Sequence, residues 1–153
     1  AAANPITVNR AASSQTADLE QWQNSGGTVL AAIQAAGTAS FSGNVIYNQS
    51  TNAQSAASYT LVLTDSGKFV EMNNAALNYI IIPSNANAAF ATGARINIIQ
   101  TGAGPTVFSA STGVTLNFYS PTGATTASVA GQWGGITLVK RATDTWAAIG
   151  DIK

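Results

Sequence analysis

Short apolar runs separated by turn residues recur along most of the chain, and this pattern limits the fold more than any other feature. Residues 93–108 show it most clearly. Within them, Ile96 and Ile98 alternate with polar neighbours, which is the period of a half-buried strand. Ile99 breaks the alternation, which predicts a bulge or burial on both faces at that position. The segment is therefore predicted to form two strands joined by a turn.

The turn in this segment contains two glycines and has two interpretations. Gly102 and Gly104 are free to take positive φ angles, as a tight hairpin turn requires. The same spacing begins a dinucleotide-binding loop, but Val107 stands where that loop has its third glycine. Pro105 and the β-branched residues after it are also a poor start for the helix that such a loop needs. The residues favour the hairpin.

The same pattern continues through residues 58–153. Turn signals follow one another at short intervals, and Val114, Leu116 and Phe118 alternate with polar residues. About eight short strands with regular turns are typical of a sandwich or a barrel. No stretch has a sustained helical period. We therefore predict an all-β chain whose C-terminal domain, residues 58–153, is an antiparallel β-sandwich or barrel.

The N-terminal third is less clear. Residues 1–16 are small and polar and are predicted to form an extended arm. Thr16, Asp18 and Glu20 could cap a helix, but turn signals at about ten-residue spacing favour short strands. Residues 17–57 are therefore predicted to form a short-stranded collar followed by a polar linker. Strands with so few large side chains cannot bury a core alone, whereas three copies around an axis could.

The composition restricts the classes of partner. Charged residues make up 8% of the chain, against the usual ~25%, and the net charge is zero. A surface with few charges resists association poorly, so burial in an assembly is favoured over a soluble extracellular module. The six basic residues are scattered, which argues against nucleic acid. No apolar run reaches the ~20 residues of a membrane span, and no signal peptide is expected.

The sequence offers little catalytic equipment. It contains no histidine and no cysteine, which removes the commonest general base and the commonest metal ligands. Two of Asp65, Glu71 and Asp144 could form a glycosidase-like pair, but turn formation and a solvated strand position explain these residues as well. Asp65 and Asp144 with Asn side chains could form a calcium site, but no ligand spacing supports one. Lys140 and Arg141 are expected at the solvated end of a strand. We predict no enzyme, no cofactor and no metal site.

Aromatic residues are the remaining candidates for a binding site. Six aromatic residues could supply a sugar-stacking platform, although aromatics in β-domains more often belong to a core or an interface; they are Trp22, Trp133, Trp146, Tyr47, Tyr79 and Tyr119. Tyr119 and Trp133 are the residues predicted to face a ligand.

Three phrases of the sequence carry a family resemblance. They are residues 16–33 (TADLEQWQNSGGTVLAAI), residues 59–75 (YTLVLTDSGKFVEMNNA) and the pair formed by residues 93–108 and 136–152. Together they span most of the chain, and they resemble a recurring module of tailed-bacteriophage virion proteins. They are structural phrases and not catalytic motifs.

The resemblance implies a non-enzymatic, usually trimeric virion component, assembled in the host cytoplasm. Units similar to residues 16–33 tend to form interwound β structure on a threefold axis. Leu19, Trp22, Val29 and Ile33 are accordingly expected at the trimer interface. The short chain favours a capsid decoration (cement) protein or a short head fibre over a full tail fibre, with residues 1–16 anchored to the shell.

Three functional alternatives stay open at this point. The first is the structural virion protein, whose partners would be sister subunits and a major capsid protein or tail component. The second is a receptor- or glycan-binding tail fibre module, which would contact a host surface glycan. The third is an enzyme such as a depolymerase, which would require a pair of carboxylates in a groove.

Overall fold

The computed structural model describes residues 20–34, 38–43, 48–120, 123 and 125–153. The chain divides into two units, Ala1–Asn48 and Gln49–Lys153. Every regular element in the described residues is a β-strand, apart from the single 3₁₀ turn η1 (Leu63–Asp65). Within those residues no helix has the length and hydropathy to cross a membrane. The prediction of an all-β chain is confirmed.

The smaller unit contains a three-stranded antiparallel sheet. Its strands are β1 (Glu20–Gln23), β2 (Val29–Ile33) and β3 (Ala39–Phe41), with β2 in the centre. The Asn24 side chain forms the first turn, because its Oδ1 accepts the N–H groups of Gly26 at 3.0 Å and Thr28 at 2.9 Å. The short strands predicted here are confirmed. Thr16 and Asp18, the other residues of the possible helix cap, lie outside the described residues.

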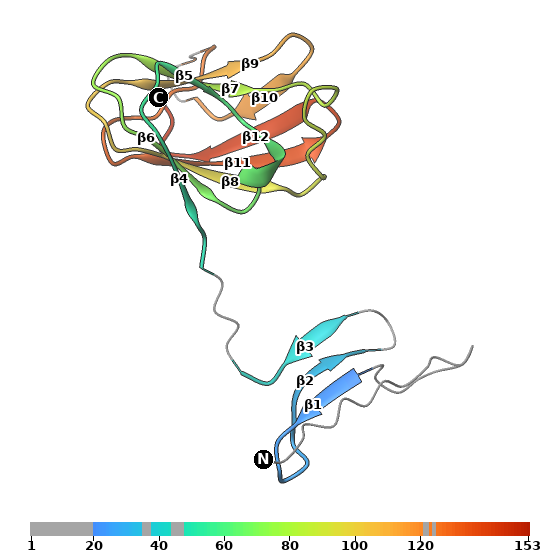
Figure 1. Cartoon of the computed structure of the whole chain (residues 1–153). Coiled ribbons are helices and arrows are strands. Elements are labelled where there is room, and N and C mark those ends of the chain that lie inside the picture. Colours follow the sequence, from blue (N-terminus) through green and yellow to red (C-terminus); the bar gives the residue numbers. More distant parts are fainter. Residues whose placement is uncertain (1–19, 35–37, 44–47, 121–122, 124) are drawn as a thin grey trace. The chain divides into compact units, whose positions relative to one another are not determined.

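The larger unit consists of two sheets that share one core (Figure 1). The six-stranded sheet has the order β10-β12-β11-β8-β6-β4, and the three-stranded sheet has the order β5-β7-β9. The six-stranded sheet is formed by β4 (Thr51–Gln54), β6 (Phe69–Met72), β8 (Arg95–Gln100), β10 (Thr115–Phe118), β11 (Gly135–Ala142) and β12 (Thr145–Gly150). The three-stranded sheet is formed by β5 (Ser58–Thr60), β7 (Asn78–Ile82) and β9 (Thr106–Ala110).

The division between the units lies earlier than the sequence indicates. It follows Asn48, whereas the C-terminal domain was expected to begin at residue 58. The reason is β4, which pairs along its whole length with β6 and so belongs to the larger unit. Its residues are Thr, Asn, Ala and Gln, which do not show the apolar alternation that identifies a strand.

From β4 to β10, successive strands alternate between the two sheets, which makes much of the pairing parallel. We call two consecutive strands, one in each sheet, a coil of the chain; the three coils are β4–β5, β6–β7 and β8–β9. Strands of neighbouring coils then pair in parallel, β4 with β6 and β6 with β8, and likewise β5 with β7 and β7 with β9. The prediction of an antiparallel domain is therefore wrong for these strands. It is correct for β11, which is antiparallel to both β8 and β12.

The turn between β8 and β9 is consequently not a hairpin. It carries the chain from the six-stranded to the three-stranded sheet, and neither of its glycines has a positive φ angle. Both are required by close packing instead. A Cβ atom on Gly102 would overlap the backbone of Asn74, and one on Gly104 would overlap the carbonyl group of Ala76. The two turns that follow β6 and β8 are thus stacked backbone on backbone.

The core fills the space between the sheets. Val70, Met72, Ile96 and Ile98 face it from the six-stranded sheet, and Ile80, Ile82 and Phe108 face it from the three-stranded sheet. The predicted alternation of Ile96 and Ile98 is confirmed. Ile99 is half-buried on the opposite face with no shift of register in β8, so the break in alternation reflects burial on both faces and not a bulge.

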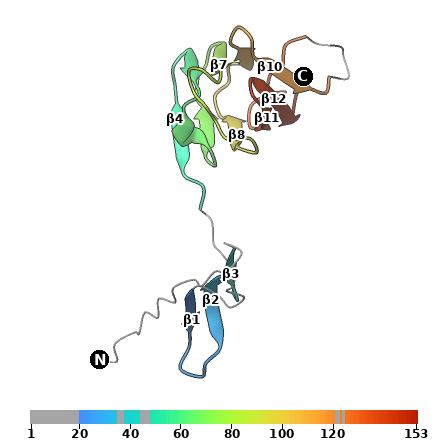
Figure 2. The same ribbon diagram turned by 90° about the vertical axis from the view of Figure 1, so that its right-hand side faces the viewer.

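The hairpin of β11 and β12 closes the other end of the stack, as Figure 2 shows with β4 and β12 on opposite sides of the unit. Trp146 is fully buried there, in edge-to-face contact with Phe90 at 5.2 Å between ring centroids. Lys140, expected in solvent, is 2% exposed because it follows Ile136 and Leu138 on the inward face of β11. Its Nζ lies 5.0 Å from the Trp146 ring centroid, a cation–π contact.

Candidate functional site

A buried carboxylate lies at the β4 end of the stack. Asp65 is 0% exposed and accepts hydrogen bonds from Asn52 Nδ2 at 2.8 Å, Tyr59 Oη at 2.9 Å and the backbone N–H of Val62 at 2.9 Å. Asn52 Nδ2 also donates to Tyr59 Oη at 2.8 Å. Both carboxylate oxygens are therefore occupied by neighbouring groups. The expected turn-forming role of Asp65 is confirmed, and this arrangement joins β4, β5 and η1.

The same cluster perturbs the Tyr59 phenol. Burial, followed by the hydrogen bond to the Asp65 carboxylate, raises the pKa of Tyr59 above its ordinary value of 10.0. The folded chain then holds this proton more tightly than the unfolded chain. The associated stabilisation is complete below pH 10 and is lost as the pH rises above that value.

We expect Tyr59→Phe to flatten the alkaline loss of stability, because it removes the titrating group. Urea unfolding between about pH 9 and pH 11 would measure this as a smaller decrease in unfolding free energy than the wild type shows. Tyr119→Phe is the matched control, since Tyr119 is 80% exposed. An unchanged slope for Tyr59→Phe would show that Tyr59 does not carry the effect.

Asp144, Asp151 and Glu71 do not converge on Asp65. Asp144 Oδ1 accepts the N–H of Asn85 at 2.6 Å, and Asp151 Oδ2 accepts the N–H of Gly135 at 3.1 Å. Glu71 lies on the outward face of β6, opposite to the inward Val70 and Met72. Across the described part of the chain, no group of three or more acidic, histidine or cysteine residues is placed to hold a metal ion.

The two aromatic residues predicted to face a ligand are both exposed. Tyr119 is 80% and Trp133 is 69% exposed. Tyr119 directly follows β10, which is parallel to β12, and Trp133 precedes β11, which is antiparallel to β12. Both residues therefore lie at the same end of the six-stranded sheet, where β10 and β12 finish and β11 begins.

An unusual backbone angle and a hollow mark this end of the sheet. Trp133 has a φ angle of 68°, which is rare for a bulky side chain, and its N–H donates to Gln100 O at 2.6 Å. A hollow of about 450 Å³ lies next to Tyr119 and is lined also by Ala148, Ile149, Gly150 and Ile152. Backbone conformations of this kind concentrate at functional positions, so the end of the sheet is a candidate ligand site.

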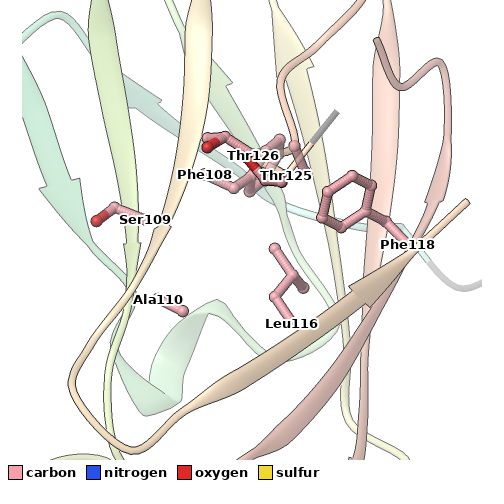
Figure 3. Close-up of a pocket in the computed structure, with 8 residues that line it drawn as sticks. Phe108, Ser109, Ala110, Leu116, Phe118, Thr125 and Thr126 are labelled. Carbon is pink, nitrogen blue, oxygen red and sulfur yellow. The ribbon is translucent and has the colours of Figure 1, made fainter. Parts of the chain in front are cut away.

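A second hollow opens between β9 and β10. Its volume is about 340 Å³, and its walls combine apolar side chains with hydroxyl groups. Figure 3 shows Leu116 and Phe118 entering from β10, with Phe108 from β9 and Thr125 and Thr126 on the facing side. Leu116 and Phe118 are half-buried and pack on the core. None of the described residues that line this groove is charged, and they offer apolar contact and hydroxyl hydrogen bonds.

The smaller unit presents an apolar sheet face. Trp22 on β1 and Phe41 on β3 both lie opposite Ala31 on β2, so the three side chains share one face, together with Val29 and Ile33. Trp22 is 46% and Phe41 is 58% exposed. We call these five residues the N-terminal apolar face.

Three of the four expected interface residues, Trp22, Val29 and Ile33, are brought together on this face. Leu19 lies outside the described residues. Phe41 was missed, because a single aromatic after a short polar strand gives no periodic signal; its place is fixed by the pairing of β3 with β2. Comparison of the chain with protein-family models, curated proteins and solved structures found no match.

Proposed function

We propose that the protein is a non-enzymatic structural component of a tailed-phage virion, a trimeric capsid decoration protein or short head fibre held by its N-terminal arm. The sequence resemblance and the low charge support this role. The exposed apolar residues of the smaller unit support it as well.

The N-terminal apolar face is the observation that carries the proposal. In the described part of the smaller unit, Ala32 is the one side chain of the buried hydrophobic set, while Trp22 and Phe41 remain about half exposed. A three-stranded sheet that buries so little apolar area gains little stability from burial, which scales with that area. Sharing the face among three copies would bury these aromatics and supply the missing core.

We expect Phe41→Glu to dissociate the assembly, because it places a charge in a surface that association would bury. The change in dissociation constant should be tenfold or more, about 1.4 kcal/mol or more. Leu30→Glu is the matched control, because Leu30 is 47% exposed but lies on the opposite face of β2. Light scattering over a dilution series measures both variants.

The mass of the wild-type chain decides the proposal. A mass of three chains at micromolar concentration is expected. A mass of one chain, or equal dissociation by Phe41→Glu and Leu30→Glu, would contradict it. The position of the protein in an intact particle, seen by electron microscopy, would then distinguish a capsid site from a tail site.

A second candidate function is recognition of a receptor or glycan. The exposed Trp133, with its unusual backbone angle, and Tyr119 at the same end of the sheet favour it. Aromatic faces stack on the apolar side of sugar rings, and an uncharged surface suits a neutral glycan. Binding on a glycan array that Trp133→Ala abolishes would support this function over a purely structural one.

A further inference from the structure

The outward face of the three-stranded sheet carries no charge. Along each strand the inward residues, such as Ile80, Ile82 and Phe108, belong to the core, so the alternate residues face outward. The register aligns them in two rows, one formed by Ser58, Tyr79 and Val107 and the other by Thr60, Ile81 and Ser109. We call these six residues the uncharged face. Figure 3 shows the Ser109 hydroxyl directed away from Leu116 and Phe118, as this assignment requires.

The central strand of this sheet has the composition of a strand buried on both sides. In β7, Tyr79, Ile80, Ile81 and Ile82 form a continuous apolar run. A strand with one face in water normally alternates apolar and polar residues, whereas a continuous run is typical of parallel strands covered on both faces. Tyr79 is nevertheless 38% exposed in the single chain. The outward half of this run therefore lacks the cover that its composition predicts.

The six-stranded sheet differs on its outward side. There Glu71 on β6 and Arg95 on β8 occupy outward positions, and Arg95 is exposed. Charges at such positions keep a sheet in water and oppose burial against another protein. The uncharged face carries no charged residue of this kind. Two copies of it placed against each other would bury aliphatic and aromatic surface and would bring no like charges together.

We propose that the uncharged face is the contact between copies of the larger unit, so that the three-stranded sheets of sister chains pack on one another. The proposal rests on the proposed self-association and adds a second, separate interface to the N-terminal apolar face. Its occupant is a second copy of this chain, because the face is complementary to itself in charge and chemistry. Val107 and Ile81 become buried on both sides in the assembly.

A labelling experiment on the full chain tests this. The wild type contains no cysteine, so Ser109→Cys and Ile149→Cys each introduce one unique thiol. Both positions are exposed in the single chain, and Ile149 lies on β12 in the other, six-stranded sheet. At a concentration where light scattering gives the mass of several chains, the thiol at position 109 should react with a maleimide at least tenfold more slowly than the thiol at position 149. Dilution to single chains should remove the difference.

The outcomes separate the two proposals. Equal reaction rates in an assembly of confirmed mass would overturn the uncharged face as an interface and leave the N-terminal contact intact. A wild-type chain that remains single at all concentrations would contradict both proposals. Slow reaction at position 109 that persists in single chains would also overturn this inference, because the protection would then come from within one copy.

Discussion

Gly104→Ala should destabilise the larger unit by about 3 kcal/mol, near the upper end of the usual cost of added bulk in a packed site. The added methyl group would overlap the carbonyl carbon and oxygen of Ala76. The obstacle is backbone from the preceding coil, which no side-chain rotation can move away. Two stacked turns would have to separate, and Thr106 with its hydrogen bond to Asn78, 2.8 Å between Oγ1 and Oδ1, would move with them.

Gly131→Ala is the matched control in the same unit. A Cβ atom at Gly131 meets no atom within 4 Å, and its φ angle is not positive. Its effect on the unfolding free energy should stay within about 0.5 kcal/mol. Urea titration followed by circular dichroism compares the two variants. Similar stability of both would show that the turns are not packed against each other as described.

Trp146→Ala should cost about 4 kcal/mol. Trp146 is the largest fully buried side chain of the described core, and its removal leaves a cavity between Phe90 and the end of the β11–β12 hairpin. It also removes the ring below the Lys140 ammonium group, which has no hydrogen-bond partner among the described residues. An ammonium group buried without a partner is itself costly, so the loss should reach the high end for a tryptophan.

Trp133→Ala provides the comparison for this residue type. Its side chain is 69% exposed, so the same substitution should change the unfolding free energy by less than about 0.5 kcal/mol. Tryptophan fluorescence and urea unfolding measure both variants. Comparable losses at positions 133 and 146 would mean that the β11–β12 end is not packed around Trp146.

The positions of most strands could be predicted because alternation is a local property. Val114, Leu116 and Phe118 pack on the core as their spacing indicates, and the strands on both sides of the Asn24 turn form a hairpin. Strand β4 could not be found in this way. It contains no large apolar residue, and its inward side chains, Asn52 and Gln54, take part in hydrogen bonds instead of the apolar core.

The pairing of the strands could not be predicted, because turn residues do not determine which sheet the following strand joins. Asp65, Gly67 and the glycines of the β8–β9 turn carry signals that hairpins also use. In this fold they lead into the other sheet, and the partner of each strand lies one coil away. The β11–β12 turn has similar chemistry and does form a hairpin. Only the packing of distant segments distinguishes the two cases.

Two buried polar side chains show the same limit at the level of single residues. Gln100 is 2% exposed, and its amide donates to Gly102 O at 3.3 Å and accepts the N–H of Thr106 at 3.1 Å. Lys140 is buried against an aromatic ring. Residue type alone predicts that both side chains are exposed to solvent, whereas both are buried because of their inward positions on β8 and β11. Trp22, Val29 and Ile33 share a face because alternation along β2 and pairing with β1 were both foreseeable, and their part in a trimer interface stays a prediction.

Alternation of the chain between two sheets has a kinetic consequence. Ile98 pairs with Val70, 28 positions earlier, and Phe108 pairs with Ile80 at the same separation. Few contacts can therefore form before a whole further coil has been synthesised, and loop-closure entropy opposes each of them. The unit should therefore fold slowly for its size. During synthesis, the apolar residues of β7 should stay exposed until β8 and β9 have been made. Aggregation should compete with folding during this period.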